Sequence, residues 1–499
     1  MMPRSLTATV LLIIAGVAPA RAEGAAIPGG TSPFLIAPFL LLLTAIALMP
    51  FVNRRWWERK YPLVCLGLGA IPVCYYLLIL HDPSRVLETG RDYLGFITLI
   101  GSLFVVAGGI HIRTRGESTP TSNAMLLAIG AVASNVLGTT GASMILIRPF
   151  LAANQHRMKG FHVVFFIFVV SNIGGALSPI GDPPLFLGYL KGVPFFWVLE
   201  NVWYIWIIAI AAILIVFLAL DRRSFMSYKS REGAIGPAPD THIKGEISGL
   251  HNLFFVGVIL SSLLIERPLY LREVLMVLSA AASYLTTGKE IHRKNEFNLL
   301  PVREVAIIFL GIFATMVPAL EWLELNASHI GIKTPGQFYW GTGALSSVLD
   351  NAPTYLNFLS ASIGLLVDPK LVSQVQHLVS TQGADLASVG GAHAEEIQNT
   401  FVALVKYHSG LLATGSAPPE TIKICYLIAN HGIYLKAISS AAVFFGAVTY
   451  IGNGPNFMVK SIAERSGAKT PSFAGYVLRY SIPILVPLFV TLWLLFFRG

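Results

Sequence analysis

The chain alternates long apolar runs with short polar loops that are rich in lysine and arginine. Several runs approach or exceed the roughly 20 residues that a helix needs to cross the hydrocarbon core of a membrane. Basic loops are typical of the cytoplasmic side, and almost all of them fit one orientation of this chain. The pattern therefore predicts an all-α polytopic membrane protein. The runs are residues 34–51, 61–80, 93–112, 122–151, 161–190, 202–220, 251–265, 268–287, 302–320, 340–365, 434–460 and 473–497.

The composition excludes most other classes of protein. Of the 499 residues, 54% are hydrophobic and 12% are charged, whereas soluble domains average about 25% charged residues. The formal net charge of +9 is dispersed over loops, so the lipid bilayer is the expected partner and nucleic acid is not. The sequence contains no HExxH, GxSxG or Walker motif and no metal-ligand spacing of cysteine and histidine. We therefore expect neither an enzyme nor a bound cofactor.

The amino terminus has the layout of a secretory signal peptide. Arg4 precedes an apolar stretch over residues 6–17, and Ala20-Arg21-Ala22 provides a small-residue cleavage site. This arrangement predicts a signal peptide over residues 1–22 and a mature chain that starts outside a bacterial inner membrane. The alternative is a first membrane helix, for which the apolar stretch is short.

Two of the apolar runs have polar centres. Residues 122–151 contain Ser134-Asn135 followed by a Gly-Thr-Thr-Gly stretch, and residues 340–365 contain Asp350-Asn351. The first run has basic residues at both ends, which predicts that its two ends lie on the same side of the membrane. We therefore interpret both runs as re-entrant hairpins, with Ser134-Asn135 corresponding to Asp350-Asn351.

Two further runs are interrupted by glycine and proline. Residues 161–190 break at Ile180-Gly181-Asp182-Pro183-Pro184, and residues 434–460 break at Ile451-Gly452-Asn453-Gly454-Pro455. Each half of the chain thus has a hairpin followed by a broken helix, and the basic loops insert the two hairpins from opposite sides. This is the inverted-topology plan of many secondary transporters, whose sites lie at the breaks near the midplane of the membrane.

These elements predict the organisation of the whole chain. The first half covers residues 34–220, a cytoplasmic linker covers residues 221–250, and the second half covers residues 251–499. A polar insertion at residues 367–421 has few basic residues, so we expect it in the periplasm.

The candidate ion-binding residues lie at the four polar interruptions. Unwound backbone survives in a membrane only where it is buried in protein or lines an aqueous cavity, and neutral side-chain oxygens suit a dehydrated cation such as sodium. Asp182 and Asp350 are the important additions, because a carboxylate inside a membrane segment is costly and can carry an exchanged proton. Each could instead cap the half-helix that follows it. The candidates are Asn135, Thr139, Thr140, Asp182, Asp350, Asn351, Thr354, Asn453 and Asn456, with backbone breaks at Gly141, Gly181, Gly452 and Gly454.

The stretch from Asn172 to Asp182 (Asn-Ile-Gly-Gly-Ala-Leu-Ser-Pro-Ile-Gly-Asp) resembles the ion transporter superfamily. It is similar to NhaD-type sodium/proton antiporters, and Ile180-Gly181-Asp182-Pro183-Pro184 is also similar to arsenite permeases. Asp350-Asn351-Ala352-Pro353-Thr354 resembles the hairpin motif of the second half. The resemblance extends to the citrate transporter branch. It implies two inverted repeats and a homodimer.

The expected function is secondary active transport by alternating access. A fixed negative charge at Asp350 opposes an anionic substrate, so the sequence favours sodium (or another monovalent cation)/proton antiport, with Na⁺ and H⁺ as the transported ions. The alternative is an ion-coupled carrier of citrate or another small organic or inorganic anion. A channel would not need paired inverted broken helices, and a membrane enzyme lacks a supporting motif. Arg148 lies near a hairpin end and would favour the anion if its side chain faced the hairpin tips.

Overall fold

The computed structural model describes residues 33–115, 118–232, 244–265, 268–384, 386, 389–413 and 415–498. The signal peptide expected at residues 1–22 lies outside the described residues. Within them, seven helices are long and apolar enough to cross a membrane, or eight if the bent pair Asn351–Leu366 and Pro369–Ser380 forms one span. The prediction of a helical chain with many potential membrane spans is thereby confirmed.

The first half of the chain is built from helices and one short strand. It comprises η1 (Pro33–Ile36), α2 (Ala37–Val52), α3 (Arg54–Leu78), α4 (Pro83–Gly108), β1 (His111–Arg115), α5 (Pro120–Ala153), α6 (Gly160–Val169), η2 (Ile173–Gly175), α7 (Pro183–Leu190) and α8 (Trp197–Glu232).

The second half has the same character, and one of its segments, η6, is a π-helix. It comprises β2 (Lys244–Ser248), α9 (Asn252–Ser262), α10 (Leu271–Thr286), α11 (Lys289–Lys294), α12 (Leu300–Asn326), η3 (Ala327–His329), α13 (Pro335–Ser346), α14 (Asn351–Leu366), α15 (Pro369–Ser380), α16 (Ala394–Tyr407), α17 (Ser409–Ala413), α18 (Pro419–Phe444), η5 (Phe445–Val448), α19 (Gly454–Arg465), α20 (Phe473–Tyr476), η6 (Val477–Leu485) and α21 (Val486–Phe496).

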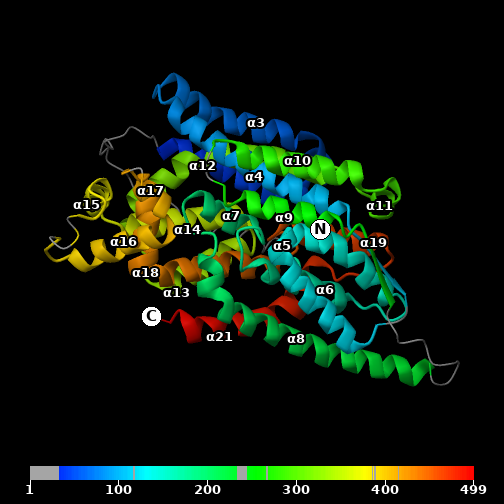
Figure 1. The fold of residues 1–499 in the computed structure, drawn as a ribbon. Coiled ribbons are helices and arrows are strands. Elements are labelled where there is room, and N and C mark those ends of the chain that lie inside the picture. Colours follow the sequence, from blue (N-terminus) through cyan, green and yellow to red (C-terminus); the bar gives the residue numbers. More distant parts are fainter. Residues whose placement is uncertain are drawn as a thin grey trace.

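The helices form layers around the interrupted segments (Figure 1). The long helices α3, α4, α10 and α12 lie on one side of the molecule, and α8 and α21 run along the opposite edge. The hairpin and broken-helix segments α5, α6, α7 and α14 lie between these two layers. The interrupted segments are therefore covered by protein on both sides, which is where non-helical backbone is tolerated in a membrane protein.

The two hairpins start where local capping signals begin a helix. The Thr119 side chain accepts the backbone N–H of Ser122, and the Ser122 hydroxyl accepts the backbone N–H of Thr119. Thr334 and Gln337 make the same reciprocal pair, and proline occupies the first helical position in both cases. This capping box satisfies backbone donors that have no partner inside the helix. It also explains why the second hairpin begins at Pro335, five residues before the predicted start.

The helix α8 continues into the predicted linker at residues 221–250 and ends at Glu232. This helix has 36 residues, or about 54 Å at 1.5 Å per residue, so it exceeds a hydrocarbon core of about 30 Å. After the undescribed residues 233–243, β2 pairs antiparallel with β1, with His111 opposite Ser248. This ribbon joins the end of the linker to the loop before the first hairpin.

The insertion at residues 367–421 was expected to be a polar segment, and it forms helices with a small apolar core of their own. Leu371, Val375 and Leu378 of α15 pack with Phe401 and Leu404 of α16. The same cluster includes residues from the first turns of α18. The insertion is therefore a helical unit seated on the start of α18.

Candidate functional site

The segment α5 folds back on itself as a hairpin. Gly138 interrupts the helix with φ 75° and ψ 154°, a left-handed φ that glycine adopts without steric cost. The two ends of the hairpin meet, because the Ser118 N–H donates to the Ala153 carbonyl at 3.0 Å. The break was placed at Gly141 from the sequence. That position is wrong, since Gly141 lies in the helical second arm.

The second hairpin consists of α13 and α14, and Asp350 lies at its turn. The Asp350 carboxylate accepts the backbone N–H of Ala352 at 3.1 Å and is the N-cap of α14. The Thr354 hydroxyl donates back to the Asp350 carbonyl at 3.0 Å. The side chains of Asp350 and Thr354 thus stabilise the start of α14, which is the capping alternative considered for Asp350.

The bases of the two hairpins lie at opposite ends of α8. Asn123, near the start of the first hairpin, donates to Asp221 close to the carboxyl end of α8 at 2.8 Å. The insertion that directly follows the second hairpin contacts the amino end of α8, where Lys406 lies 3.4 Å from Glu200. Figure 1 shows α15, α16 and α17 at one end of the molecule and α11 and α19 at the other.

Both broken helices are interrupted over longer segments than expected. In the first, α6 ends at Val169 and α7 begins at Pro183. In the second, α18 ends at Phe444 and α19 begins at Gly454, with the short η5 between them. Asn135 fills the first interruption, because its amide donates to the Gly174 carbonyl at 2.7 Å and accepts the Leu177 N–H at 2.8 Å.

The two interruptions share one pattern of hydrogen bonds. In the first, the Ser178 hydroxyl donates to the Asn135 carbonyl at 2.5 Å and accepts the Gly181 N–H at 3.0 Å. In the second, the Thr449 hydroxyl donates to the Ser347 carbonyl at 2.6 Å and accepts the Gly452 N–H at 3.0 Å. Two breaks far apart in the sequence are therefore held to their hairpins in the same way.

This pattern corrects the correspondence expected between the hairpins. Ser134 donates to the Val170 carbonyl at 2.7 Å, as Ser346 donates to the Ala442 carbonyl at 2.6 Å. Ser134-Asn135 therefore corresponds to Ser346-Ser347 and not to Asp350-Asn351. At the same spacing Thr139 corresponds to Asn351 and Gly138 to Asp350. The predicted pairing was about one helical turn out of register, because it matched the amide side chains by type.

Asp182 lies where these elements meet, and its side chain is fully buried. Its Oδ1 accepts the Thr139 hydroxyl from the first hairpin at 3.0 Å. The same oxygen accepts the Asn453 amide from the second break at 3.0 Å. Its Oδ2 accepts the Asn351 amide from the second hairpin at 2.9 Å. The structure thus gathers Thr139, Asp182, Asn351 and Asn453 from the predicted set around one carboxylate.

The other candidates lie around this cluster and do not contact its carboxylate. Asn456 is buried in α19, where it donates to the Gly446 and Thr449 carbonyls at 2.8 and 2.9 Å. Its Oδ1 accepts the amide of Asn172, a residue absent from the predicted set, at 2.6 Å. Thr140 is half-buried beside Thr139, and Gly454 is exposed at the first position of α19.

The last membrane helix supports the second break. The Tyr476 hydroxyl donates to the Ala447 carbonyl at 2.8 Å. Ser481, inside the π-helix η6, donates to the Val448 carbonyl at 2.8 Å. Segments of π-helix occur frequently at functional sites, and here the wide turn provides donors for carbonyls freed by the interruption.

The charge around Asp182 differs from that of an anion-binding site. Among the described residues, no lysine, arginine or histidine is bonded to Asp182. Arg148 was the residue that would favour an anion, and it forms an ion pair with Glu296 at 3.1 Å away from the hairpin tips. The hydrogen-bond donors to the carboxylate are a neutral hydroxyl and two neutral amides.

A buried ionic cluster at the base of the first hairpin was not predicted. Arg157 forms an ion pair with Asp221, and His162 lies 3.0 Å from the same carboxylate. The side chains of Asp221 and His162 are fully buried and that of Arg157 is 3% exposed. This cluster could not be predicted, because Arg157 and Asp221 lie among the charged residues that flank apolar runs, as residues of a solvated loop also do.

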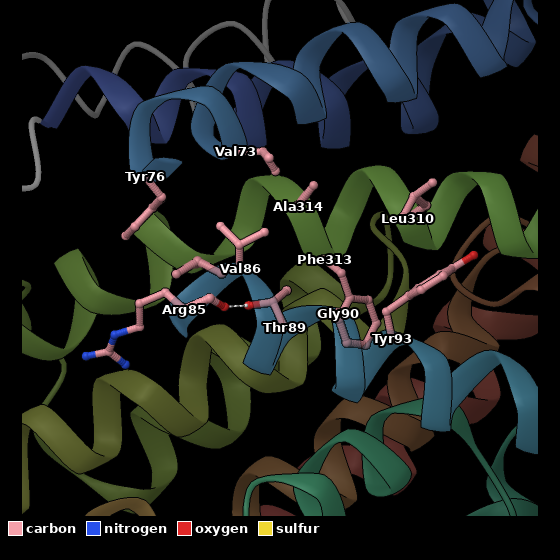
Figure 2. Close-up of a pocket in the computed structure, with 11 residues that line it drawn as sticks. Val73, Tyr76, Arg85, Val86, Thr89, Gly90, Tyr93, Leu310, Phe313 and Ala314 are labelled. Atoms are coloured by element: carbon pink, nitrogen blue, oxygen red, sulfur yellow. Dashed lines mark hydrogen bonds between the residues drawn. The ribbon is translucent and has the colours of Figure 1, made fainter. Parts of the chain in front are cut away.

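Two cavities in the described part of the chain lie away from Asp182. The first, of about 120 Å³, lies between α3, α4 and α12 and is lined mainly by apolar residues such as Val73, Val86 and Phe313 (Figure 2). The second, of about 90 Å³, is lined by both apolar and charged residues, the latter including Glu88 and Lys191. Neither contains a predicted site residue, so neither changes the choice of site.

A family described as "putative citrate transport" matches residues 30–497. The chain belongs to this citrate transport family. Membership in the citrate transport family, together with seven or more helices able to span a membrane, makes the protein a multi-pass membrane protein of transporter type. No curated protein gives a match to the chain.

Proposed function

We propose that the protein is an ion-coupled secondary transporter whose cargo is citrate or a similar small carboxylate and whose coupling site is Asp182. The observation that carries this proposal is the convergence of both hairpins and the second break on one buried carboxylate. Thr139, Asn351 and Asn453 each donate to it at 2.9 to 3.0 Å. A change in the charge of this carboxylate would alter contacts with three separate elements at once.

Burial makes the ionised form of Asp182 costly unless a positive charge or a proton accompanies it. Three neutral donors reduce this cost but leave the net charge in place. A proton or a monovalent cation would neutralise the site, and a citrate anion would approach it more readily once it is neutral. This dependence of one ligand on the other is what couples two fluxes.

Alternating access by two inverted repeats is part of the same proposal. It is supported by the equal hydrogen bonds of Ser178 and Thr449 to the two hairpins. It is also supported by the position of the hairpin bases at opposite ends of α8. Two similar halves inserted from opposite sides give similar routes to the site from each side of the membrane. The resemblance to the ion transporter superfamily supports a homodimer in a bacterial inner membrane.

A second candidate is sodium/proton antiport without an organic cargo. It is supported by the neutral donors around Asp182 and by the ion pair that holds Arg148 at Glu296. In this case the carboxylate would bind a sodium ion and a proton alternately, since either one neutralises its buried charge.

The test is transport by the purified full chain in proteoliposomes, with labelled citrate and an internal pH indicator. The proposal expects citrate uptake that requires a proton or sodium gradient and is lost in Asp182→Asn, which cannot titrate. Asp82→Asn is the matched control, because Asp82 is an exposed N-cap outside the site and asparagine caps as well as aspartate. A change in the internal pH of the proteoliposomes that is driven by sodium and occurs without citrate transport would favour the second candidate. Unchanged citrate uptake by Asp182→Asn would overturn the coupling role.

A further inference from the structure

The two cavities of the described chain adjoin each other. Arg85, Thr89 and Val317 line both of them. The first cavity is lined mainly by apolar side chains, and the second contains several charged ones. An apolar space beside a charged space matches a ligand that has an apolar chain and a charged head.

The apolar cavity lies between α3, α4 and α12, three helices that are able to span the membrane. Figure 2 shows Arg85 at one end of this cavity and Tyr93 and Leu310 at the other. Phe313 is 1% exposed, whereas Leu310 is 37% exposed. The cavity is therefore a groove that leads from the interior to the surface of the layer, where acyl chains surround a membrane protein.

Water has little to bind in this groove. Three hydroxyls line it, and each donates its one hydrogen within the chain: Thr89 to the Arg85 carbonyl at 2.9 Å, Tyr76 to Glu321 at 2.8 Å, and Tyr93 to the Ala306 carbonyl at 3.0 Å. A buried water requires two to four polar partners, and apolar cavities of similar size stay dry and bind apolar molecules.

Gly90 keeps one wall of the groove open. A Cβ at this position would meet no atom within 4 Å, although glycine inside a helix costs about 0.5–1 kcal/mol relative to alanine. Neither a left-handed backbone nor a close contact within the described chain requires glycine here. Gly69 of α3 differs, because a Cβ there would lie 3.1 Å from the Ala314 side chain. The space over Gly90 is thus available to a ligand.

The charged cavity contains groups of both signs. Its cations are Arg85 and Lys191, and its carboxylates are Glu88, Glu321, Glu324 and Glu420. Most of these groups already have a partner in the chain. Lys191 pairs with Asp92 at 2.8 Å, and Lys423 pairs with Glu324 and Glu420 at 2.5 and 3.0 Å.

Arg85 and Glu88 remain available. They lie one turn apart on α4, both are exposed, and no ion pair joins them in the described part of the chain. The carboxylate oxygen of Glu321 lies 3.7 Å from the Arg85 guanidinium, beyond the usual range of a hydrogen bond. One positive and one negative group are therefore exposed side by side at the end of the apolar groove.

The depth of the two cavities also fits a lipid. Leu310 and Val317 are about 10 Å apart along α12, within the roughly 15 Å of half a hydrocarbon core. The charged cavity lies close to the ends of helices, because Arg85 is in the first turn of α4 and Glu324 is two residues before the end of α12. This places the charged groups at the level of lipid headgroups.

We propose that the two cavities bind a phospholipid with a phosphoethanolamine headgroup. One acyl chain lies over Gly90, the phosphate contacts Arg85 and the ammonium contacts Glu88. A guanidinium donates two parallel hydrogen bonds to a phosphate, and a primary ammonium has three hydrogens for carboxylates. A choline headgroup lacks these hydrogens, and a glycerol headgroup lacks the positive charge. The proposal requires only that the chain lies in a membrane, so it does not depend on the transported cargo.

The test is lipid binding by the purified full chain in detergent micelles. Native mass spectrometry counts the bound lipids, and tryptophan fluorescence follows thermal unfolding, since a ligand that binds only the folded protein raises its stability. Dioleoyl phosphatidylethanolamine should stabilise the chain at a concentration about fivefold or more below that of the phosphatidylcholine and phosphatidylglycerol with the same chains. Equal effects of the three lipids would overturn the proposal, and so would equal stabilisation by O-phosphoethanolamine, which has no acyl chain.

Gly90→Leu fills the groove without removing a contact. It should need about tenfold or more phosphatidylethanolamine for the same shift. Its unfolding temperature without lipid should not fall, because the new side chain enters open space and leucine is the better helix former. Gly67→Leu is the matched control, since Gly67 of α3 also faces open space but lines neither cavity. Unchanged lipid binding by Gly90→Leu would contradict the groove as the acyl-chain site.

Two further variants test the headgroup. Glu88→Gln should reduce the preference for phosphatidylethanolamine over phosphatidylcholine to about twofold or less, and Arg85→Gln should weaken the binding of all three lipids. Arg91→Gln, on the same helix but outside both cavities, should bind as the wild type does. A preference that persists in Glu88→Gln would overturn the headgroup assignment, including the case in which Gly90→Leu does not fold.

A second copy of the chain is the other occupant that the experiment detects. If Gly90→Leu changes the number of chains per particle in the mass spectrum but leaves the bound lipid unchanged, the groove is covered by a second copy and the lipid proposal is wrong.

Discussion

The Asn351 amide donates to the carboxylate of Asp182 at 2.9 Å, although the two residues are 169 positions apart in the chain. Asn351 is the first residue of α14, and Asp182 directly precedes α7. The bond therefore joins the second hairpin to the first break. Any movement of one half of the molecule relative to the other must stretch or replace it.

The two aspartates at the interruptions should respond differently to asparagine. Asp350 accepts a hydrogen bond from the Ala352 N–H as the N-cap of α14, and asparagine caps equally well. Asp350→Asn should therefore change the free energy of unfolding by less than about 0.5 kcal/mol and retain transport. Asp182→Asn should fold and lose ion-coupled transport. Transport by both variants in the same proteoliposomes is the measurement; equal loss in the two would show that Asp350 also titrates.

Removing the carboxylate of Asp221 should destabilise the protein strongly. Asp221→Asn leaves Arg157 as an unpaired buried charge, and breaking a buried ion pair costs about 3–5 kcal/mol. Arg148→Gln breaks the more exposed ion pair with Glu296 and should lower the free energy of unfolding by less than about 1 kcal/mol. Thermal unfolding of both variants tests this ranking. The double variant Asp221→Asn/Arg157→Gln should recover part of the loss, and no recovery would contradict the pairing.

Tyr476→Phe should weaken the second break without changing the ring packing. It removes the hydroxyl that donates a hydrogen bond to the Ala447 carbonyl at 2.8 Å. A buried acceptor left without a donor lowers the free energy of unfolding by about 1–3 kcal/mol. Hydrogen exchange should increase over residues 445–453, with a loss of apparent ion affinity. Tyr284→Phe, on a half-exposed residue of α10, is the control. Exchange that rises equally in both variants would contradict a local role.

Acid should loosen the insertion through Glu396. The Tyr426 hydroxyl donates to Glu396 at 2.6 Å, and this bond, with a smaller effect from His393, holds the pKa of Glu396 below its ordinary value. A depressed pKa in the folded state adds stability above the unfolded pKa of about 4.3, and this contribution is lost as the pH falls through the folded pKa.

Hydrogen exchange over α16 should therefore increase as the pH falls from about 4.3, the ordinary pKa of glutamate, to about 3. Glu396→Gln should lack this increase and should already be less stable at neutral pH by about 0.5–1 kcal/mol, because the side chain is partly exposed. Glu395→Gln, on an exposed neighbour, should behave as the wild type does. An acid response that persists in Glu396→Gln would assign the effect to another group.

The sequence predicted a helical chain of apolar segments and both interruptions, because hydropathy and glycine-proline clusters act locally. It also singled out Thr139, Asp182, Asn351 and Asn453, since polar residues inside an apolar run are few. The two hairpins could not be aligned from the sequence. The equivalence of Ser134 and Ser346 becomes visible only in the backbone carbonyls to which their hydroxyls donate. Gly138 and Asp350 occupy equivalent positions at the turns of the two hairpins. The chain turns there through a left-handed backbone at Gly138, and Asp350 caps the second arm with its side chain.

Burial was the other property that the sequence did not provide. Asp221 follows the apolar run of residues 202–220 and looked like the start of a solvated loop, yet it is fully buried against Arg157. Asn172 lies inside an apolar segment, but it donates a hydrogen bond to Asn456, 284 positions away. The insertion was judged by its polar content, and its apolar positions form a core only when α15 and α16 pack together.

Asn453 occupies in the second half the position that Asp182 occupies in the first, 271 residues earlier. Asp182 thus has a neutral amide as its counterpart, and the acidic residue of the second half, Asp350, caps α14 instead. One carboxylate can exchange one elementary charge per turnover at this position. Each such charge moved across the full membrane is worth about 2.3 kcal/mol per 100 mV. In the proposed transport cycle, the charge carried at Asp182 would therefore set how strongly the membrane voltage can drive this step.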